Sequence, residues 1–253
     1  MNAHLSRWRV QVSGADSALE HLLKHFNKTP LKFFPATLPG QIEFKSESFS
    51  SCLSADEVRA QANRELQMLS GVLALDGRSF DALQVGAVFE ERPDGGRNVI
   101  VTVTGAELKV SAGEVSAVVT VADANGNQVI QEPSPPRTVA LVALALVDGN
   151  VGKAMRLVVA PDFRSWVGLY RLHDVIESDL GGMKALAACK WGSEADLRRF
   201  KHSANSVTVG GDVSRHGKEE TSPPSYPMSI EEAEGYVRCV LESWLSHKSQ
   251  SAA

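Results

Sequence analysis

The stretch Gln131-Glu-Pro-Ser-Pro-Pro-Arg137 separates two parts of the chain that differ in periodicity. Three prolines within four positions favour an extended connector, because proline fixes φ, lacks an amide hydrogen and restricts the residue before it. Strand patterns dominate before this stretch, and helix patterns dominate after it. The sequence therefore predicts an α+β protein, in which an N-terminal antiparallel sheet with two helices is followed by a C-terminal helical bundle.

Residues 1–130 are expected to form the α+β sheet domain, joined to the bundle by the connector at 131–137. Trp8-Arg-Val-Gln-Val12 alternates between apolar and polar residues, as a half-buried strand does. Ser54-Ala-Asp-Glu57 has the capping-box pattern that opens a helix, and Pro93-Asp-Gly-Gly96 and Asp123-Ala-Asn-Gly-Asn127 have hairpin-turn chemistry. We expect strands at 8–12, 31–34, 41–49, 83–91, 98–104 and 115–121, and helices at 17–26 and 54–70.

Residues 138–248 are expected to form the helical domain. Two helices, 138–148 and 151–159, should break at Gly149-Asn150, and a third, capped by Asp162, should end at Gly181-Gly182, where glycine permits a left-handed residue. Ser193 is expected to cap a helix running to about Ser203. Ser229-Ile-Glu-Glu232 is a second capping box, followed by helical spacing of apolar residues over four turns. The small, polar residues 249–253 are expected to form a disordered tail.

Bulk properties restrict the function. The 253-residue chain is 43% apolar and has a formal net charge of -4, so a nucleic-acid surface would have to be a local patch. The longest apolar run, 139–147, is about half the roughly 20 residues that span a bilayer, and the N-terminus does not resemble a secretion signal. Cys52, Cys189 and Cys239 are odd in number and far apart, which favours buried free thiols in the cytoplasm over disulfides or a zinc site.

The segment from Phe200 to Gly217 gathers titratable and hydrogen-bonding side chains in a short polar passage between two helix patterns. Gly210-Gly211 gives the chain freedom to fold back, which could bring its two imidazoles close together. One His would act as general base and the other as general acid on a phosphodiester, while Arg would stabilise the developing negative charge. The candidate catalytic residues are His202, Asn205, Arg215 and His216.

The helix from Ser193 carries basic residues away from its predicted apolar face, which contains Leu197 and Phe200. These cations could contact a phosphate, or they could form a solvated helix end that complements the helix dipole. The candidate substrate-binding residues are Arg198, Arg199, Lys201 and Asp212. Two alternatives involve no chemistry: the loop could only close the domain, or it could form a binding site. A metal site of His202, Asp212 and His216 is a further, less favoured alternative. No cofactor and no metal are expected.

His173-Asp174 is a weaker candidate. Neighbouring residues on a helix point in different directions, so these two side chains do not form a dyad. A packed histidine at the edge of the core is the favoured interpretation. Phosphate-loop, nucleophile-elbow and His-Glu-x-x-His motifs do not occur in the sequence.

The C-terminal third resembles an uncharacterised bacterial family in the stretches 169–182, 199–205, 211–217 and 223–233, which assigns no activity. More distantly, its bundle, polar Arg-His-Gly element at Arg215-His216-Gly217 and final amphipathic helix resemble HEPN domains. These helical domains often act as dimeric ribonucleases in toxin and antiphage systems. The Arg-to-His spacing that marks such nucleases is longer than the spacing between Arg198 and His202.

Two functions follow as hypotheses. The first is an RNA-acting, HEPN-like effector of a bacterial defence or toxin system, a ribonuclease if it is an enzyme. The second is a non-catalytic module that binds a ligand or a partner in a defence or regulatory complex. The expected partners are RNA or a nucleotide, a second copy in a homodimer, or another protein. No membrane association is expected.

Overall fold

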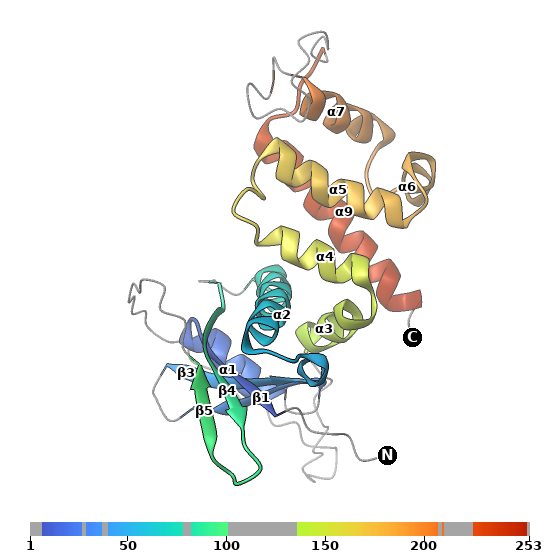
Figure 1. Cartoon of the computed structure of the whole chain (residues 1–253). Coiled ribbons are helices and arrows are strands. Elements are labelled where there is room, and N and C mark those ends of the chain that lie inside the picture. The colour runs from blue at the N-terminus through green and yellow to red at the C-terminus, as the bar shows by residue number, and fades with distance from the viewer. Residues whose placement is uncertain are drawn as a thin grey trace, which may run out of the picture. The chain divides into compact units, whose positions relative to one another are not determined.

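The computed structural model describes residues 7–26, 29–36, 40–77, 82–100, 136–206, 209 and 225–251. The chain forms two compact units, drawn in Figure 1. Unit 1 contains Met1–Leu66 and Leu75–Ala140, and unit 2 contains Gln67–Ala74 and Leu141–Ala253. The sequence predicts a boundary at 131–137, but it gives no sign that Gln67–Ala74 belongs with the C-terminal residues.

Unit 1 is built on an antiparallel sheet with the strand order β2-β3-β1-β4-β5. Its first four strands and two α-helices follow each other as β-α-β-β-α-β, the connectivity of ferredoxin-like sheets. This confirms the predicted α+β class and the antiparallel sheet. The elements are β1 (Trp8–Ser13), α1 (Asp16–His25), β2 (Leu31–Pro35), β3 (Gln41–Ser46), the 3-10 helix η1 (Glu47–Ser51), α2 (Ala55–Leu75), β4 (Gln84–Glu91) and β5 (Arg97–Ile100).

One face of the sheet forms the apolar core of unit 1. Val10 of β1 pairs with Phe44 of β3 and with Val88 of β4, and all three side chains are fully buried. The rings of Phe33 and Phe44 stack with centroids 4.9 Å apart. Side chains alternate between the two faces of a strand, so this register places Arg9 of β1 and its cross-strand neighbours on the opposite face.

The pairing of β1 with β4 contains a bulge between Val10 and Val12 that the sequence pattern did not reveal. There the amide of Ala87 donates to the side-chain oxygen of Gln11 at 3.2 Å. A Cβ at Gly86 would lie 2.7 Å from the same oxygen. Glycine therefore permits this close approach of strand and side chain.

The hairpin between β4 and β5 confirms the turn predicted at 93–96. The amide of Arg92 donates to the carbonyl of Gly96 at 2.8 Å, and Gly95 has φ of 82°. The predicted strand 41–49 is wrong beyond Ser46, whose hydroxyl accepts from the amide of Ser48 at 3.3 Å and starts η1. Residues 101–104 of one predicted strand, the whole strand 115–121 and the turn at 123–127 lie outside the described residues.

Unit 2 is a helical bundle in which α5 contacts α4, α6, α7 and α9. Its described helices confirm the predicted helical bundle of the C-terminal part. They are α3 from its Leu141 onward (Arg137–Val147), α4 (Gly149–Val158), α5 (Trp166–Asp179), α6 (Met183–Cys189), α7 (Glu194–Asn205) and α9 (Ile230–Ser251). Within the described ranges, no helix is both long and apolar enough to cross a bilayer.

The helix ends of unit 2 agree with the predicted capping chemistry in most places. Asp148 caps α4 by accepting from the amides of Asn150 and Val151, so the break lies one residue before the predicted Gly149. Gly181 and Gly182 have φ of 92° and 111° and end α5 as predicted. The predicted Asp162 cap is wrong, because this carboxylate pairs with Arg171 at 2.7 Å while Ser165 caps α5.

Two further features of unit 2 differ from the sequence prediction. Helix α6 has no predicted counterpart, since its seven residues are too few for a clear periodic pattern. Helix α9 continues to Ser251, so the first residues of the predicted 249–253 tail are helical. The ammonium group of Lys248 donates to Asp148 at 2.8 Å and to Asp179 at 2.9 Å, which holds this end of α9 on the bundle.

The three cysteines are free, as predicted, but they are not buried. Cys52 and Cys189 are half-buried, and Cys239 is exposed. Cys239 lies on α9 outside the buried stripe that contains Val237, Val240 and Leu241.

The capping box of α9 gives a first test. The hydroxyl of Ser229 accepts from the amide of Glu232 at 3.2 Å, and the Glu232 carboxylate accepts from the amide of Ser229 at 2.9 Å. Ser229→Ala should lower the free energy of unfolding by about 1 kcal/mol, because two amides at the helix start lose or weaken their partner. Ser246→Ala, at an exposed site within the same helix, should leave it unchanged or slightly raised. Equal effects in urea unfolding would contradict the assignment of the cap.

Within unit 2, the contact between α4 and the Gln67–Ala74 part of α2 gives a second test. A Cβ at Gly71 would lie 2.0 Å from the carbonyl oxygen of Met155, whereas a Cβ at Gly149 would meet nothing within 4 Å. Gly71→Ala should therefore destabilise the protein by about 2–3 kcal/mol through overpacking. Gly149→Ala should be neutral or slightly stabilising in thermal unfolding, because alanine has a higher helix propensity than glycine. A Gly71→Ala protein as stable as the parent would disprove the close approach.

Candidate functional site

Helix α7 carries five of the eight residues that the sequence predicts to form a site: Arg198, Arg199, Lys201, His202 and Asn205. The helix begins where predicted, because the Ser193 hydroxyl accepts from the amide of Asp196 at 2.9 Å. The other three, Asp212, Arg215 and His216, lie outside the described residues. The predicted approach of the two imidazoles across the Gly210-Gly211 segment therefore stays a prediction.

Each predicted phosphate-binding cation of α7 already contacts oxygen atoms of the chain itself. Arg198 pairs with Glu194 one turn earlier on the exposed side of the helix. Arg199 donates to Glu232 at 2.7 Å and to the carbonyls of Tyr226 and Pro227, which ties α7 to the start of α9. These pairs leave α7 with less unbalanced positive charge than its sequence indicates.

Lys201 faces the interior of the bundle rather than solvent. Its ammonium group lies 2.8 Å and 2.5 Å from the two carboxylate oxygens of Glu177 on α5. Both side chains are mostly buried, so the pair is only weakly screened by water and salt. Lys201 thus connects α7 to α5, the helix at the centre of unit 2.

His202 and Asn205 lie at the end of α7 and differ in environment. His202 is exposed, while Asn205 is half-buried and its side-chain oxygen is shielded from solvent. Within the described residues, neither this oxygen nor the buried hydroxyl of the next residue, Ser206, has a hydrogen-bond partner. Such groups carry a desolvation cost, so this helix end is the part of the predicted site with the most unsatisfied polarity.

The most unusual titratable group of unit 2 is His173, which the sequence analysis placed at the edge of the core. The ring is fully buried and has centroid distances of 5.0 Å to Phe200 and 6.0 Å to Tyr236. Neither ring nitrogen has a hydrogen-bond partner in the described part of the chain. Burial, helped by the positive charge of Lys201, lowers the pKa of His173 to about 3.

At neutral pH, His173 is therefore uncharged and cannot exchange protons as an efficient acid or base. General acid–base catalysis needs a group whose pKa lies near the working pH. Nδ1 of His173 lies 3.5 Å from a carboxylate oxygen of Glu177, but Lys201 already neutralises that carboxylate. His173, Glu177 and Lys201 thus form a buried, charge-balanced cluster with a structural role.

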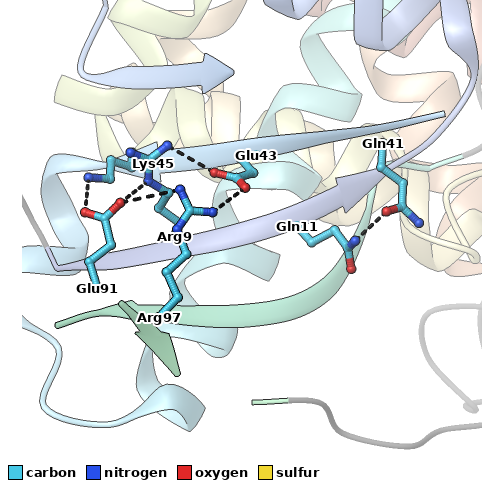
Figure 2. Close-up of polar contacts among 7 residues, drawn as sticks. All are labelled: Arg9, Gln11, Gln41, Glu43, Lys45, Glu91 and Arg97. Carbon is cyan, nitrogen blue, oxygen red and sulfur yellow. Dashed lines mark hydrogen bonds and ion pairs between the residues drawn. The ribbon is translucent and has the colours of Figure 1, made fainter. Parts of the chain in front are cut away.

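A second polar cluster lies on unit 1 and was not found from the sequence. Figure 2 shows charged side chains from four strands meeting in one cluster. The strand register places this cluster on the face opposite the apolar core. Glu43 accepts from Arg9 at 3.0 Å and from Arg97 at 2.7 Å. Glu91 accepts from Arg9 at 2.5 Å and from Lys45 at 2.8 Å. Each carboxylate therefore bridges two cations from different strands.

We name this surface the polar sheet face and define it by the strand register. Its amide side chains Gln11 and Gln41 hydrogen-bond to each other across β1 and β3. Its charged members comprise four cations and two carboxylates, a surplus of two positive charges. The polar sheet face contains Arg9, Gln11, Ser13, Lys32, Phe34, Gln41, Glu43, Lys45, Gln84, Phe89, Glu91, Arg97 and the exposed Val99.

The ion pairs also affect the acidity of this cluster. Burial alone would raise the pKa of Glu91, but the hydrogen bond from Lys45 and the charges of Arg9 and Lys45 outweigh it, so the pKa lies below its ordinary value. Glu91 is therefore ionised at neutral pH.

The alternation of polar and apolar residues in Trp8–Ser13 and Gln41–Ser46 was the sequence signal for this polar face. The order of the strands in the sheet, which brings the charged side chains together, could not be read from it.

Two half-buried aromatic rings accompany the cations of the polar sheet face. The guanidinium carbon of Arg9 lies 4.9 Å from the ring centroid of Phe34, and that of Arg97 lies 5.9 Å from the centroid of Phe89. Both are within the range of cation–π attraction. Guanidinium groups and aromatic rings thus lie together on the face of the sheet opposite the apolar core of unit 1.

Neither cluster forms a metal site. Among the residues that the structure describes, no group of three His, Cys, Asp or Glu side chains is arranged to hold a metal ion. The predicted alternative of His202, Asp212 and His216 includes two residues outside the described ranges.

Comparison with protein families, with curated proteins and with solved structures finds no match for this chain. The resemblances to HEPN domains and to an uncharacterised bacterial family therefore stay predictions from the sequence, and the function must be inferred from the residues themselves.

The environment of His173 gives a third test. A depressed pKa means that the unfolded chain binds a proton that the folded chain does not, so stability falls as the pH is lowered from about 6.5 towards 3. The loss from this group should reach about 2 kcal/mol by pH 5. His173→Phe should remove that part of the acid sensitivity and leave the protein at least as stable at pH 7.5. Urea unfolding at both pH values measures this, and an unchanged difference between them would contradict it.

Proposed function

We propose that this chain is a non-catalytic binding module that recognises a ligand or partner within a regulatory or defence complex. The observation that carries the proposal is the pairing of the α7 cations. Arg198, Arg199 and Lys201 are each held by a carboxylate of the chain. Recruiting them to a reacting phosphate would require these pairs to break, and for the mostly buried Lys201–Glu177 pair this is costly.

The state of the buried histidine supports the same proposal. The imidazole of His173 is buried inside the bundle, and its low pKa makes it unsuitable for proton transfer at neutral pH. A binding module needs no such group. The polar sheet face of unit 1 offers a surface on which recognition can occur without chemistry.

A second candidate is the RNA-acting, HEPN-like effector, with His202, Asn205, Arg215 and His216 around a phosphodiester. The observation that favours it is the buried oxygen of Asn205, which has no partner in the described residues and lies at the end of α7. An amide oxygen of this kind could accept a hydrogen bond from a ribose hydroxyl or orient a catalytic side chain.

The biological setting belongs to the proposal too. A defence or regulatory role and a homodimer both follow from the resemblance to HEPN domains. A cytoplasmic location agrees with the three free cysteines, because thiols persist in reducing compartments.

Incubation of the full chain with total RNA separates the two candidates. The length distribution of the RNA should stay unchanged for the parent, for His202→Ala and for His216→Ala, while a known ribonuclease in the same buffer degrades it. Cleavage by the parent that either substitution abolishes would overturn the non-catalytic proposal and establish the second candidate.

Binding is measured in parallel by thermal unfolding with nucleotides and short RNA. A ligand at 100 times its dissociation constant stabilises the folded state by about 2.7 kcal/mol, a shift of several degrees. We expect such a shift without turnover for at least one of these ligands. Thermal unfolding that none of them changes would contradict binding of this ligand class.

A further inference from the structure

We propose that the polar sheet face of unit 1 binds single-stranded nucleic acid. This inference rests on the proposed function as a binding module, and it names the ligand class and the surface. The sequence prediction did not contain this surface, because its candidate catalytic and substrate-binding residues lie on α7 or in the segment that follows it.

Charge is the first reason. The whole chain has a formal net charge of -4, whereas the polar sheet face has four cations and two carboxylates. This local surplus of two positive charges attracts a polyanion even though the chain as a whole does not. Within the described residues Lys32 pairs with no acidic group, so it can contact a phosphate without first breaking an ion pair. Arg97 is paired with Glu43 at 2.7 Å, but its side chain is 39% exposed, so a phosphate can approach the guanidinium from the solvent side.

The carboxylates of the face restrict its cations rather than cancel them. Glu43 and Glu91 hold the guanidinium of Arg9 from two sides, so its orientation is set before a ligand arrives. Preorganisation of this kind reduces the entropy lost on binding. The carboxylates bind the guanidinium at its edge, and Phe34 lies over the guanidinium at 4.9 Å, so Arg9 and Phe34 present themselves to a ligand as one unit.

The aromatic rings are the second reason. Phe34 on β2 and Phe89 on β4 are both half-buried on this face. The order β2-β3-β1-β4 places these strands three spacings apart, about 14 Å. The two rings can thus engage two separate bases. Proteins that bind single strands combine a positive surface with aromatic side chains on which bases stack.

The same features argue against other occupants. A duplex hides the faces of its bases, so half-exposed rings would add nothing to its binding, whereas the unstacked bases of a single strand can use them. An acidic protein would satisfy the cations, but it would not need half-exposed aromatic rings beside them, such as Phe34 beside Arg9.

Fluorescence anisotropy on the full chain tests the proposal. The probes are a fluorescein-labelled 20-nucleotide uridine-rich RNA, the corresponding single-stranded DNA and a duplex of equal length, each at low and high salt. Lys32→Glu should weaken binding to the single strands by roughly fivefold and flatten its salt dependence, because one phosphate contact is lost. Phe34→Ala should weaken binding by roughly tenfold, because a stacking ring is lost.

Lys24→Glu is the matched control. It makes the same change of charge at an exposed position on α1, in the same unit but away from the polar sheet face, and its binding should equal that of the parent. Circular dichroism and thermal unfolding of every variant show whether the fold persists. If Phe34→Ala unfolds, Lys32→Glu at the edge strand still decides the question.

Three outcomes would overturn the assignment: no binding of either single strand at low salt, binding that Lys32→Glu and Lys24→Glu affect equally, or a duplex bound as tightly as the single strands. Failure of this inference is distinguishable from failure of the proposed function. RNA cleavage that depends on His202 or His216 overturns the non-catalytic role, whereas unaltered binding by the sheet variants overturns only the place of binding.

Discussion

Two carboxylates on the sheet hold the surrounding cations in place and thereby help to specify the register of the strands. Glu43 and Glu91 hold Arg9, Lys45 and Arg97 together on neighbouring strands, where three cations alone would repel one another. The apolar core on the other face requires the same register, since Val10 must meet Phe44 and Val88. A shift by one residue would move the charges into the core and the core into water. The ionic and the apolar face therefore specify one sheet.

The helical bundle uses ion pairs in a different way. Lys201 joins α7 to α5 through Glu177, and Lys248 joins the end of α9 to Asp148 and Asp179. In these places carboxylates equal or outnumber the ammonium groups, so the pairs connect helices and leave no positive charge for a ligand. On the polar sheet face the cations outnumber the carboxylates. This difference in local balance, more than the number of basic residues, distinguishes a cation that supports the fold from one that can bind.

Buried polar groups without partners mark where the two units depart from a simple apolar core. In unit 1, Oε1 of Glu65 accepts hydrogen bonds from Ser46, Ser48 and Gln61, but its buried Oε2 has no partner in the described residues, and burial raises the pKa of the carboxyl. In unit 2 the ring of His173 sits among aromatic side chains with neither nitrogen bonded in the described residues. Each such group opposes folding by its desolvation, and the surrounding apolar contacts must offset that cost.

Local chemistry made much of the fold predictable. Capping residues such as Ser193 and Ser229, the glycines at 181–182 and the alternation in Trp8–Ser13 act over a few residues, so the sequence by itself determined most helix starts, the sheet strands and the α+β class. Tertiary structure alone decided the strand order that gathers Arg9, Glu43 and Glu91, and the partners that occupy the α7 cations. It also placed the ring of His173, which the sequence predicts to be packed at the edge of the core, among aromatic side chains with neither nitrogen bonded in the described residues. The reason is that a charge acts through the groups that reach it in space, and those groups can lie far away along the chain, as Glu91 lies 82 residues from Arg9 and Asp148 lies 100 residues from Lys248.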